Sequence, residues 1–328
     1  MTEILGNDAL LASLFQAISK SKLAGCYILE GAEGSGKLTI ARHVASALMC
    51  NHPKKDGRPC CSCAACENVQ NGNHVDVVEL RPEQDSKHIP VSQVRELLST
   101  THMLPTQGDW RVLIIEQAEC MKKEAQNALL KSIEEPRPNT VFFLLTKDRT
   151  KLLPTVQSRA VKLKTQPLPP QTIRQELGKI SSDSEGIENA ILLCGGSLGK
   201  AYEILGDPGF LEARKKVLSY FEALMNGFGF SRLCQIFPPS AMQRSDLSRL
   251  LPMIKLALRD LMCLRFGGTD LCFFTDRAFA KDFASILSPA AAADFFDLIT
   301  ELEQSITQNA NLFSALSGFH LSAQRLTK

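Results

Sequence analysis

The chain has 328 residues, which is long for one compact core and predicts two or three domains. Its composition, 44% apolar and 22% charged, is that of an ordinary globular protein. A net charge of only +2 excludes a global basic field of the kind that coats DNA. The first residues lack the pattern of a signal peptide, and no apolar run of about eighteen residues predicts a membrane span, so we expect a cytoplasmic protein.

The first half of the chain alternates apolar strands with helices. Strands are predicted, in chain order, at Gly25–Glu30, Val75–Leu80, Arg111–Glu116, Thr140–Thr146 and Ala160–Thr165. Helices are predicted at Lys37–Met49, Ser92–His102 and Lys122–Glu135. This alternation predicts a five-stranded parallel sheet that is covered by helices on both faces.

A proline-rich segment at residues 166–172 marks a boundary, and almost only helical patterns follow it. We therefore expect an α/β plus all-α fold in three parts. These are an α/β domain at residues 1–166, a small helical lid domain at 167–207 and a larger helical domain at 208–328. The last part has a long series of amphipathic patterns and no site chemistry, which favours an oligomerisation domain.

A phosphate-binding loop is predicted between the first strand and the helix that follows it. Its residues are Gly31, Gly34, Ser35, Gly36 and Lys37. Glycines let backbone N–H groups surround a phosphate, the helix N-terminus adds a positive dipole, and the lysine reaches the outer phosphates. The alternative, a glycine-rich turn with an incidental lysine, fits the flanking strand and helix less well.

The positions that should hold Mg²⁺ and activate water depart from the P-loop pattern. Leu38 replaces the Ser or Thr that holds the metal, and Thr39 follows one residue late, rotated by about 100° on the helix. After the third strand, Glu116 takes the place of a metal-binding Asp and Gln117 that of the catalytic Glu. Loss of a general base costs about 10² to 10⁴ in rate. We expect weak binding of ATP or ADP, poor Mg²⁺ binding and little hydrolysis.

Four of the 11 cysteines lie close together after the P-loop helix. They are Cys50, Cys60, Cys63 and Cys66. Their spacing predicts one structural Zn²⁺ in a closed four-thiolate site, within an insert at about residues 50–74. Cys61 is the extra cysteine, and His74 is interpreted as structural, with a metal role as the alternative. Loop cysteines without a metal are the alternative for the whole cluster.

Further motifs carry a specific resemblance. Residues 127–136 read NALLKSIEEP, Thr146 ends the fourth strand, and Arg159 lies in a Ser-Arg-Ala triplet. With the P-loop, these motifs resemble, in order over the first half of the chain, the AAA+ module of bacterial DNA polymerase III clamp-loader subunits. The segment GSLGKA at residues 196–201 resembles the family's second-domain sensor, and the helix that starts at residues 309–311 resembles its C-terminal collar.

Departures from the family pattern discriminate among its subunits. The gamma/tau motors keep Lys-Thr, Asp-Glu and a sensor arginine, where this chain has Leu38, Gln117 and Gly199. This combination resembles the delta-prime branch and implies that Arg159 acts in trans, as an arginine finger on a neighbour's ATP. A structural salt bridge is the alternative role for that arginine. An ATP-hydrolysing gamma/tau-like motor is the alternative for the whole chain, and a stand-alone zinc-containing DNA-binding protein is a third hypothesis.

The resemblance also implies partners and cofactors. The partners are gamma/tau and delta subunits in a hetero-oligomeric ring, a sliding clamp, and primer-template DNA contacted through the complex during DNA replication. The cofactors are structural Zn²⁺ and weakly bound ATP or ADP. The nucleotide would lie against Gly31, Gly34, Ser35, Gly36, Lys37, Leu38, Thr39, Glu116 and Thr146.

Overall fold

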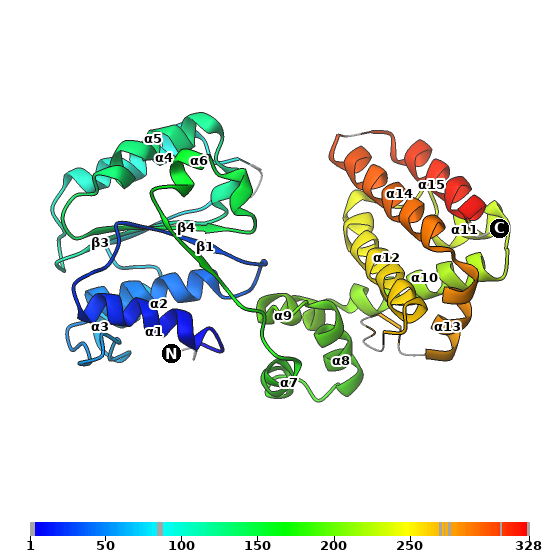
Figure 1. Ribbon diagram of the computed structural model, residues 1–328, viewed down its shortest axis with the longest axis horizontal. Helices are drawn as coiled ribbons and strands as arrows, with labels where there is room; N and C mark the ends of the chain where they lie inside the picture. The colour runs from blue at the N-terminus through cyan, green and yellow to red at the C-terminus, as the bar shows by residue number, and fades with distance from the viewer. Residues whose placement is uncertain are drawn as a thin grey trace. The chain divides into compact units, whose positions relative to one another are not determined.

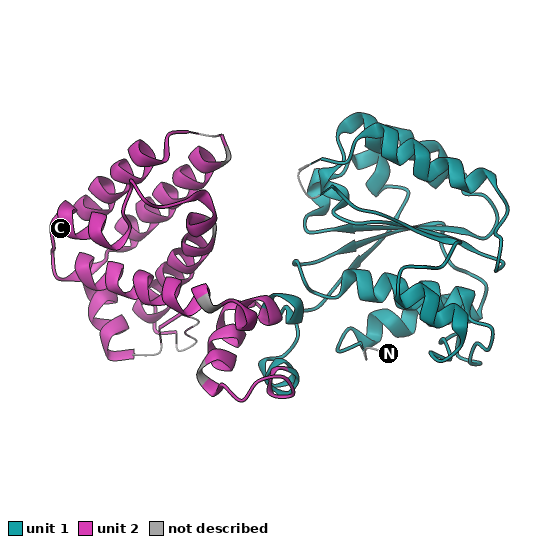
Figure 2. Cartoon of the chain, turned by 180° about the vertical axis from the view of Figure 1, so that it is seen from behind, with its two compact units in different colours: residues 1–176, 196–200 teal, residues 177–195, 201–328 magenta. Residues whose placement is uncertain are grey.

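The computed structural model describes residues 4–83, 88–268, 271, 273–274, 277–308 and 310–326; Asn309, which begins the segment compared with the collar, lies outside this range. The chain divides into two compact units (Figure 2). Unit 1 comprises residues 1–176 and 196–200, and unit 2 comprises residues 177–195 and 201–328. The three-domain division at residues 166 and 207 stays a prediction.

Unit 1 contains a parallel five-stranded sheet in the order β2-β3-β4-β1-β5. The strands are β1 (Cys26–Glu30), β2 (Val77–Leu80), β3 (Arg111–Ile115), β4 (Thr140–Thr146) and β5 (Val161–Lys164). The predicted α/β fold is confirmed, and β4 has the predicted bounds. The central strands β3 and β4 are buried along their whole length, which explains their continuous apolar sequences.

Helices cover both faces of this sheet (Figure 1). One layer contains α1 (Asp8–Ser19), α2 (Lys37–Met49) and α3 (Ala64–Gln70), and the other contains α4 (Val91–Ser99), α5 (Lys123–Glu134) and α6 (Pro154–Gln157). Alternate strand residues face opposite layers: Tyr27 packs in the core between the sheet and α1 and α2, and Ile28 packs in the core between the sheet and α4 and α5. Because the strands are parallel, the carboxyl ends of β1, β3 and β4 meet at one edge of the sheet. Ligands bind at this edge in sheets of this kind.

The rest of the described chain is helical. The helices are α7 (Pro170–Gly178), α8 (Ser184–Leu193), α9 (Leu198–Gly206), α10 (Pro208–Met225), α11 (Phe230–Ile236), α12 (Arg244–Arg265), α13 (Arg277–Ile286), α14 (Pro289–Thr307) and α15 (Leu312–Leu326). The core of unit 2 is aromatic: Phe221 of α10 contacts Phe283 and Phe295, and Tyr220 stacks on Phe237. The amphipathic patterns thus bury their apolar faces against one another.

A buried histidine joins three parts of this helical core. His320 of α15 bonds through Nδ1 to the hydroxyl of Tyr220 at 2.9 Å and through Nε2 to the carbonyl of Phe237 at 3.0 Å. Since a carbonyl only accepts, Nε2 donates the second bond, and Nδ1 of the neutral ring accepts the first. Burial lowers the pKa of His320.

In the part of the chain that the structure describes, no single helix is both long and apolar enough to cross a membrane. Residues 277–286 and 289–306 meet that test only as a pair, and the two segments are bent by 99°.

Candidate nucleotide and metal sites

The glycine-rich loop joins β1 to α2 at the carboxyl edge of the sheet. The N–H of Gly31 donates to the carbonyl of Thr146 at 3.0 Å, which ties the start of the loop to the end of β4. Gly34 has φ 68° and Gly36 has φ 82°, and glycine adopts this left-handed region without strain. Gly36 is the N-cap of α2. The loop therefore lies between a strand and a helix, as a P-loop does.

The groups that would donate hydrogen bonds to a phosphate donate them to carbonyls of the loop itself. Nζ of Lys37 donates to the carbonyls of Gly31 at 2.8 Å and Ala32 at 2.6 Å. The N–H of Ser35 donates to the same Ala32 carbonyl at 3.3 Å. Burial lowers the pKa of Lys37, and the negative charge of Glu119 partly opposes this. A nucleotide would have to compete with these internal hydrogen bonds.

Glu116, the carboxylate predicted to lie near the metal, interacts electrostatically with Glu79 and Arg42. Burial raises the pKa of Glu116, the charge of Glu79 raises it further, and Arg42 lowers it. Arg42 bonds to both carboxylate oxygens of Glu79, at 2.6 and 2.7 Å. The acidic residue after β3 whose charge raises the pKa of Lys37 is Glu119. It lies beyond the two-residue motif that the sequence predicts, so it is not expected from the sequence.

The remaining predicted nucleotide residues have local roles. Leu38 packs against the core on the α2 side of the sheet, and Thr39 is partly buried in the first turn of the helix. Gln117 is exposed and has φ 48°. The hydroxyl of Thr146 donates to the carbonyl of Asp148 at 3.0 Å and accepts from its N–H at 3.1 Å. The Thr146 hydroxyl thus stabilises the turn after β4.

The sensor-like segment contacts the P-loop directly, within unit 1. The hydroxyl of Ser197 donates to the carbonyl of Glu33 at 2.7 Å, and the N–H of Gly199 donates to the carbonyl of Gly34 at 3.1 Å. The N–H of Lys200 donates to the Ser197 hydroxyl at 3.2 Å. The sequence predicts that residues 196–201 are sensor-like, with Gly199 in place of an arginine, but no signal in the sequence predicts the bond from Ser197 to Glu33.

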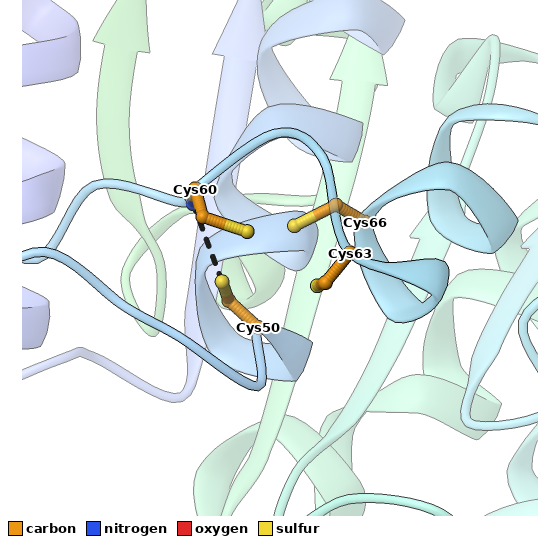
Figure 3. Close-up of side chains that lie close together, drawn as sticks. All are labelled: Cys50, Cys60, Cys63 and Cys66. Atoms are coloured by element: carbon orange, nitrogen blue, oxygen red, sulfur yellow. Dashed lines mark hydrogen bonds between the residues drawn. The ribbon is translucent and has the colours of Figure 1, made fainter.

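The four predicted metal ligands converge (Figure 3). Their Sγ atoms lie within 4.8 Å of one another. Cys50 is the C-cap of α2, Cys60 lies in the following loop, Cys63 is the N-cap of α3, and Cys66 lies in α3. A tetrahedral zinc–thiolate site with bonds of about 2.3 Å separates its sulfur atoms by about 3.8 Å. The cluster can therefore hold a metal ion after small side-chain movements.

Backbone amides support negative charge in this cluster. The N–H of Cys60 donates to Sγ of Cys50 at 3.2 Å. A hydrogen bond from the N–H of Ser62 is the main cause that lowers the pKa of Cys60 to about 6. Burial instead raises the pKa of Cys66. A bound cation would favour all four thiolates, so the donor set fits a closed structural metal site.

Cys61 and His74 have other contacts. Sγ of Cys61 donates to the carbonyl of Pro59 at 3.4 Å. His74 is buried, and its Nδ1 accepts from the N–H of Asp76 at 3.2 Å. His74 therefore makes a structural contact at the start of β2, as its interpretation from the sequence expects.

Arg159 follows α6 on the surface of unit 1. Its Nη2 lies 2.9 Å from Oε1 of Glu134, and its Nη1 donates to the carbonyl of Thr155 at 3.1 Å. The ion pair raises the pKa of Arg159 and lowers that of Glu134. The two side chains are 32% and 55% exposed, and ion pairs in contact with water contribute little to stability.

The parallel sheet, the P-loop after β1 and the acidic segment after β3 together define an α/β domain of the P-loop class. The family described as "DNA polymerase III, delta subunit" matches residues 6–169, half of the chain. The chain belongs to this family.

The chain is similar both to subunits named delta′ and to subunits named tau/gamma. DNA polymerase III subunit delta′ of Bacillus subtilis is 29% identical over 266 residues, which are 80% of this chain and 79% of that protein. Subunit delta′ of Pseudomonas aeruginosa is 36% identical over 209 residues, 63% of each chain. Subunit tau/gamma of Haemophilus influenzae is 31% identical over 178 residues, 54% of this chain and 25% of that protein. The predicted resemblance to delta-prime is confirmed.

Proposed function

We propose that the chain is a delta-prime-like subunit of the DNA polymerase III clamp-loader complex and helps to load a sliding clamp onto primed DNA during replication. The similarity to subunits named delta′ supports the subunit type. The observation that carries a non-motor role is the P-loop, whose lysine bonds to the loop carbonyls while Gln117 replaces the catalytic base. The partners would be gamma/tau and delta subunits, the clamp and primer-template DNA, and the location would be the cytoplasm.

The proposed nucleotide chemistry is weak binding of ATP or ADP with negligible hydrolysis. The loop retains the glycines and Lys37, which supports phosphate binding. Leu38 cannot coordinate Mg²⁺, and Gln117 cannot accept a proton, which argues against turnover.

The test of the function is reconstitution. A ring assembled from gamma/tau, delta and this chain should load the clamp, whereas the mixture without this chain should load it poorly. The isolated chain should show no ATP turnover above background. Turnover at a motor-like rate that Lys37→Ala abolishes would instead support the gamma/tau-like alternative.

The proposed metal is one structural Zn²⁺, bound by the four cysteines after α2. The support is that their Sγ atoms lie within 4.8 Å of one another and that the site contains only thiol donors. Four thiolates leave no open coordination position, so the metal would hold the insert together rather than take part in a reaction.

The proposed role of Arg159 is to stabilise ATP that is bound by a neighbouring subunit. A guanidinium carries a permanent charge on a planar fork, which suits a phosphate whose charge grows during transfer. The pair with Glu134 is exposed, so Arg159 can leave it at little cost when a partner offers a phosphate.

A further inference from the structure

A short segment from a distant part of the chain donates hydrogen bonds to the carbonyls of Glu33 and Gly34 in the P-loop. Residues 196–200 belong to unit 1, although residues 177–195, which precede them in the chain, belong to unit 2. Ser197 is 1% exposed and donates to the carbonyl of Glu33. At the start of the segment, the N–H of Leu168 donates to the carbonyl of Gly196 at 2.8 Å. The segment is thus bonded at both ends within unit 1.

The approach of the two backbones depends on two glycines. A Cβ added at Gly199 would lie 2.8 Å from Cα and 3.2 Å from the carbonyl oxygen of Gly34. A Cβ added at Gly34 would lie 2.6 Å from the hydroxyl of Ser197. The loop requires Gly34 for its left-handed backbone in any case. Gly199 is different, since the close contact itself excludes a side chain there.

These contacts set the direction of an amide that a phosphate would use. The peptide group between Gly34 and Ser35 is planar, so holding its carbonyl also holds its N–H. The carbonyl accepts from Gly199, and the N–H of Ser35 donates to Ala32. Lys37 donates to the same Ala32 carbonyl. While the Gly199 bond is made, the N–H of Ser35 is therefore held toward the loop itself.

We propose that residues 196–200 form a latch that closes the P-loop without nucleotide, so that a nucleoside diphosphate or triphosphate binds only when the latch lifts. Gly199 and Ser197 are then the residues that set nucleotide affinity. This inference rests on the proposed non-motor role, and it supplies a second cause of weak nucleotide binding besides the loss of the metal ligand.

The test is a titration of the full chain with a fluorescent ADP analogue. Gly199→Ala introduces the Cβ that meets Gly34, and Ser197→Ala removes the hydrogen bond to Glu33. Each variant should bind the analogue about 2- to 10-fold more tightly than the wild type, because each removes one hydrogen bond between the segment and the P-loop. Adding Lys37→Ala to Gly199→Ala should abolish the gain, which shows that the analogue binds at the P-loop.

The matched control is Gly206→Ala, at the other end of α9, where an added Cβ meets nothing within 4 Å. It should bind like the wild type. The latch is wrong if Ser197→Ala and Gly199→Ala bind no more tightly than the wild type.

Hydrogen exchange gives a second test that needs no variant. The amide of Gly199 should be protected in the nucleotide-free wild type, and fast exchange there would also contradict the latch. Both measurements use the isolated chain, so they are independent of ring assembly. A chain that behaves as expected here but fails to join the ring would contradict the proposed function and leave the latch standing.

Discussion

At the scale of single residues, Arg159 has two candidate roles, a structural ion pair and the proposed contact with a neighbour's ATP. Its guanidinium pairs with Glu134 in the free chain, which is the structural alternative considered from the sequence. The same exposure that weakens this pair leaves the arginine free to reach a partner. Substitution of each member of the pair separates the two roles.

In a reconstituted ring, Arg159→Ala should lower DNA- and clamp-stimulated ATP hydrolysis at the adjoining site without preventing assembly. Arginine fingers contribute about 10³ to 10⁵ in rate, and one finger among several sites gives a smaller effect on the total. Arg159→Lys should also impair hydrolysis, because lysine lacks the planar fork. The measurement is steady-state ATPase activity of the assembled ring.

Glu134→Gln is the matched control, since it breaks the same ion pair and keeps the arginine. Hydrolysis should stay near the wild-type rate. If Glu134→Gln and Arg159→Ala lower the rate equally, the ion pair is structural and the arginine does not act on the neighbour.

We expect His320 to make the stability of unit 2 depend on pH. Burial lowers its folded-state pKa below the unfolded value of about 6.5. Above pH 6.5 the ring is neutral in both states, so its contribution is fully present. As pH falls below about 6.5 the unfolded state binds the proton first, and the free energy of unfolding should fall by at most about 1.4 kcal/mol per pH unit until the folded-state pKa is passed.

Urea unfolding between about pH 7.5 and pH 5, followed by circular dichroism, measures this loss. His320 is the only histidine between residues 177 and 328, and Trp110, the only tryptophan, reports on unit 1 by fluorescence. His320→Gln should be less stable at pH 7.5 but should depend less on pH. An equal pH dependence in both proteins would exclude His320 as its source.

At the scale of elements, α2 and α3 hold the cysteine cluster between them. Cys50 ends one helix, Cys63 caps the other, and the loop between them has little other core. Between residues 50 and 74 the buried apolar residues are Pro59 in the loop and Cys66 and Val69 in α3. We therefore expect the proposed metal to stabilise the insert more than packing does.

Protein purified without chelator should contain about one equivalent of zinc, and Cys63→Ala should lose it and unfold the insert locally. Zinc in small modules is worth roughly 10 to 16 kcal/mol of apparent folding free energy. Metal analysis and thermal unfolding measure the two effects. Cys61→Ala is the control and should keep the metal, because its Sγ bonds to Pro59 outside the cluster. Less than about half an equivalent in the wild type, or full zinc in Cys63→Ala, would contradict the assignment.

The elements also show where local pattern succeeds. The bounds of α2 and β4 agree with the prediction, because α2 has a periodic apolar face and β4 is a continuous apolar run bounded by polar residues. The helix predicted at residues 92–102 ends at Ser99 and continues as a 3₁₀ turn to His102. The hydroxyls of Thr100 and Thr101 bond to the carbonyls of Leu97 and Leu98, which competes with regular helix bonds.

At the scale of the whole molecule, the helices after Gly206 form a core of their own and expose large apolar side chains. Phe296 of α14 is 46% exposed, and Phe313 and Leu321 of α15 are 57% and 45% exposed. Exposed apolar side chains mark a subunit contact where they form one continuous patch. We therefore expect α14 and α15 to make the contacts of the proposed oligomerisation collar, residues 208–328.

Truncation after Gly206 should leave a soluble fragment that no longer enters the ring, because the collar helices are gone. Size-exclusion chromatography with gamma/tau and delta measures co-assembly, and circular dichroism of the fragment confirms that the sheet is folded. Co-assembly of the folded fragment at the wild-type level would refute the collar.

The sequence by itself determined the parallel sheet, the P-loop, the cysteine cluster and the family, because each depends on residues that are close together in the chain or on a motif order. Only the tertiary structure decided which groups the site residues bond to. Ser197 and Glu33 are 164 positions apart, and Arg159 and Glu134 are 25 apart. No local periodicity predicts such pairs, since they form only when separate elements pack against one another.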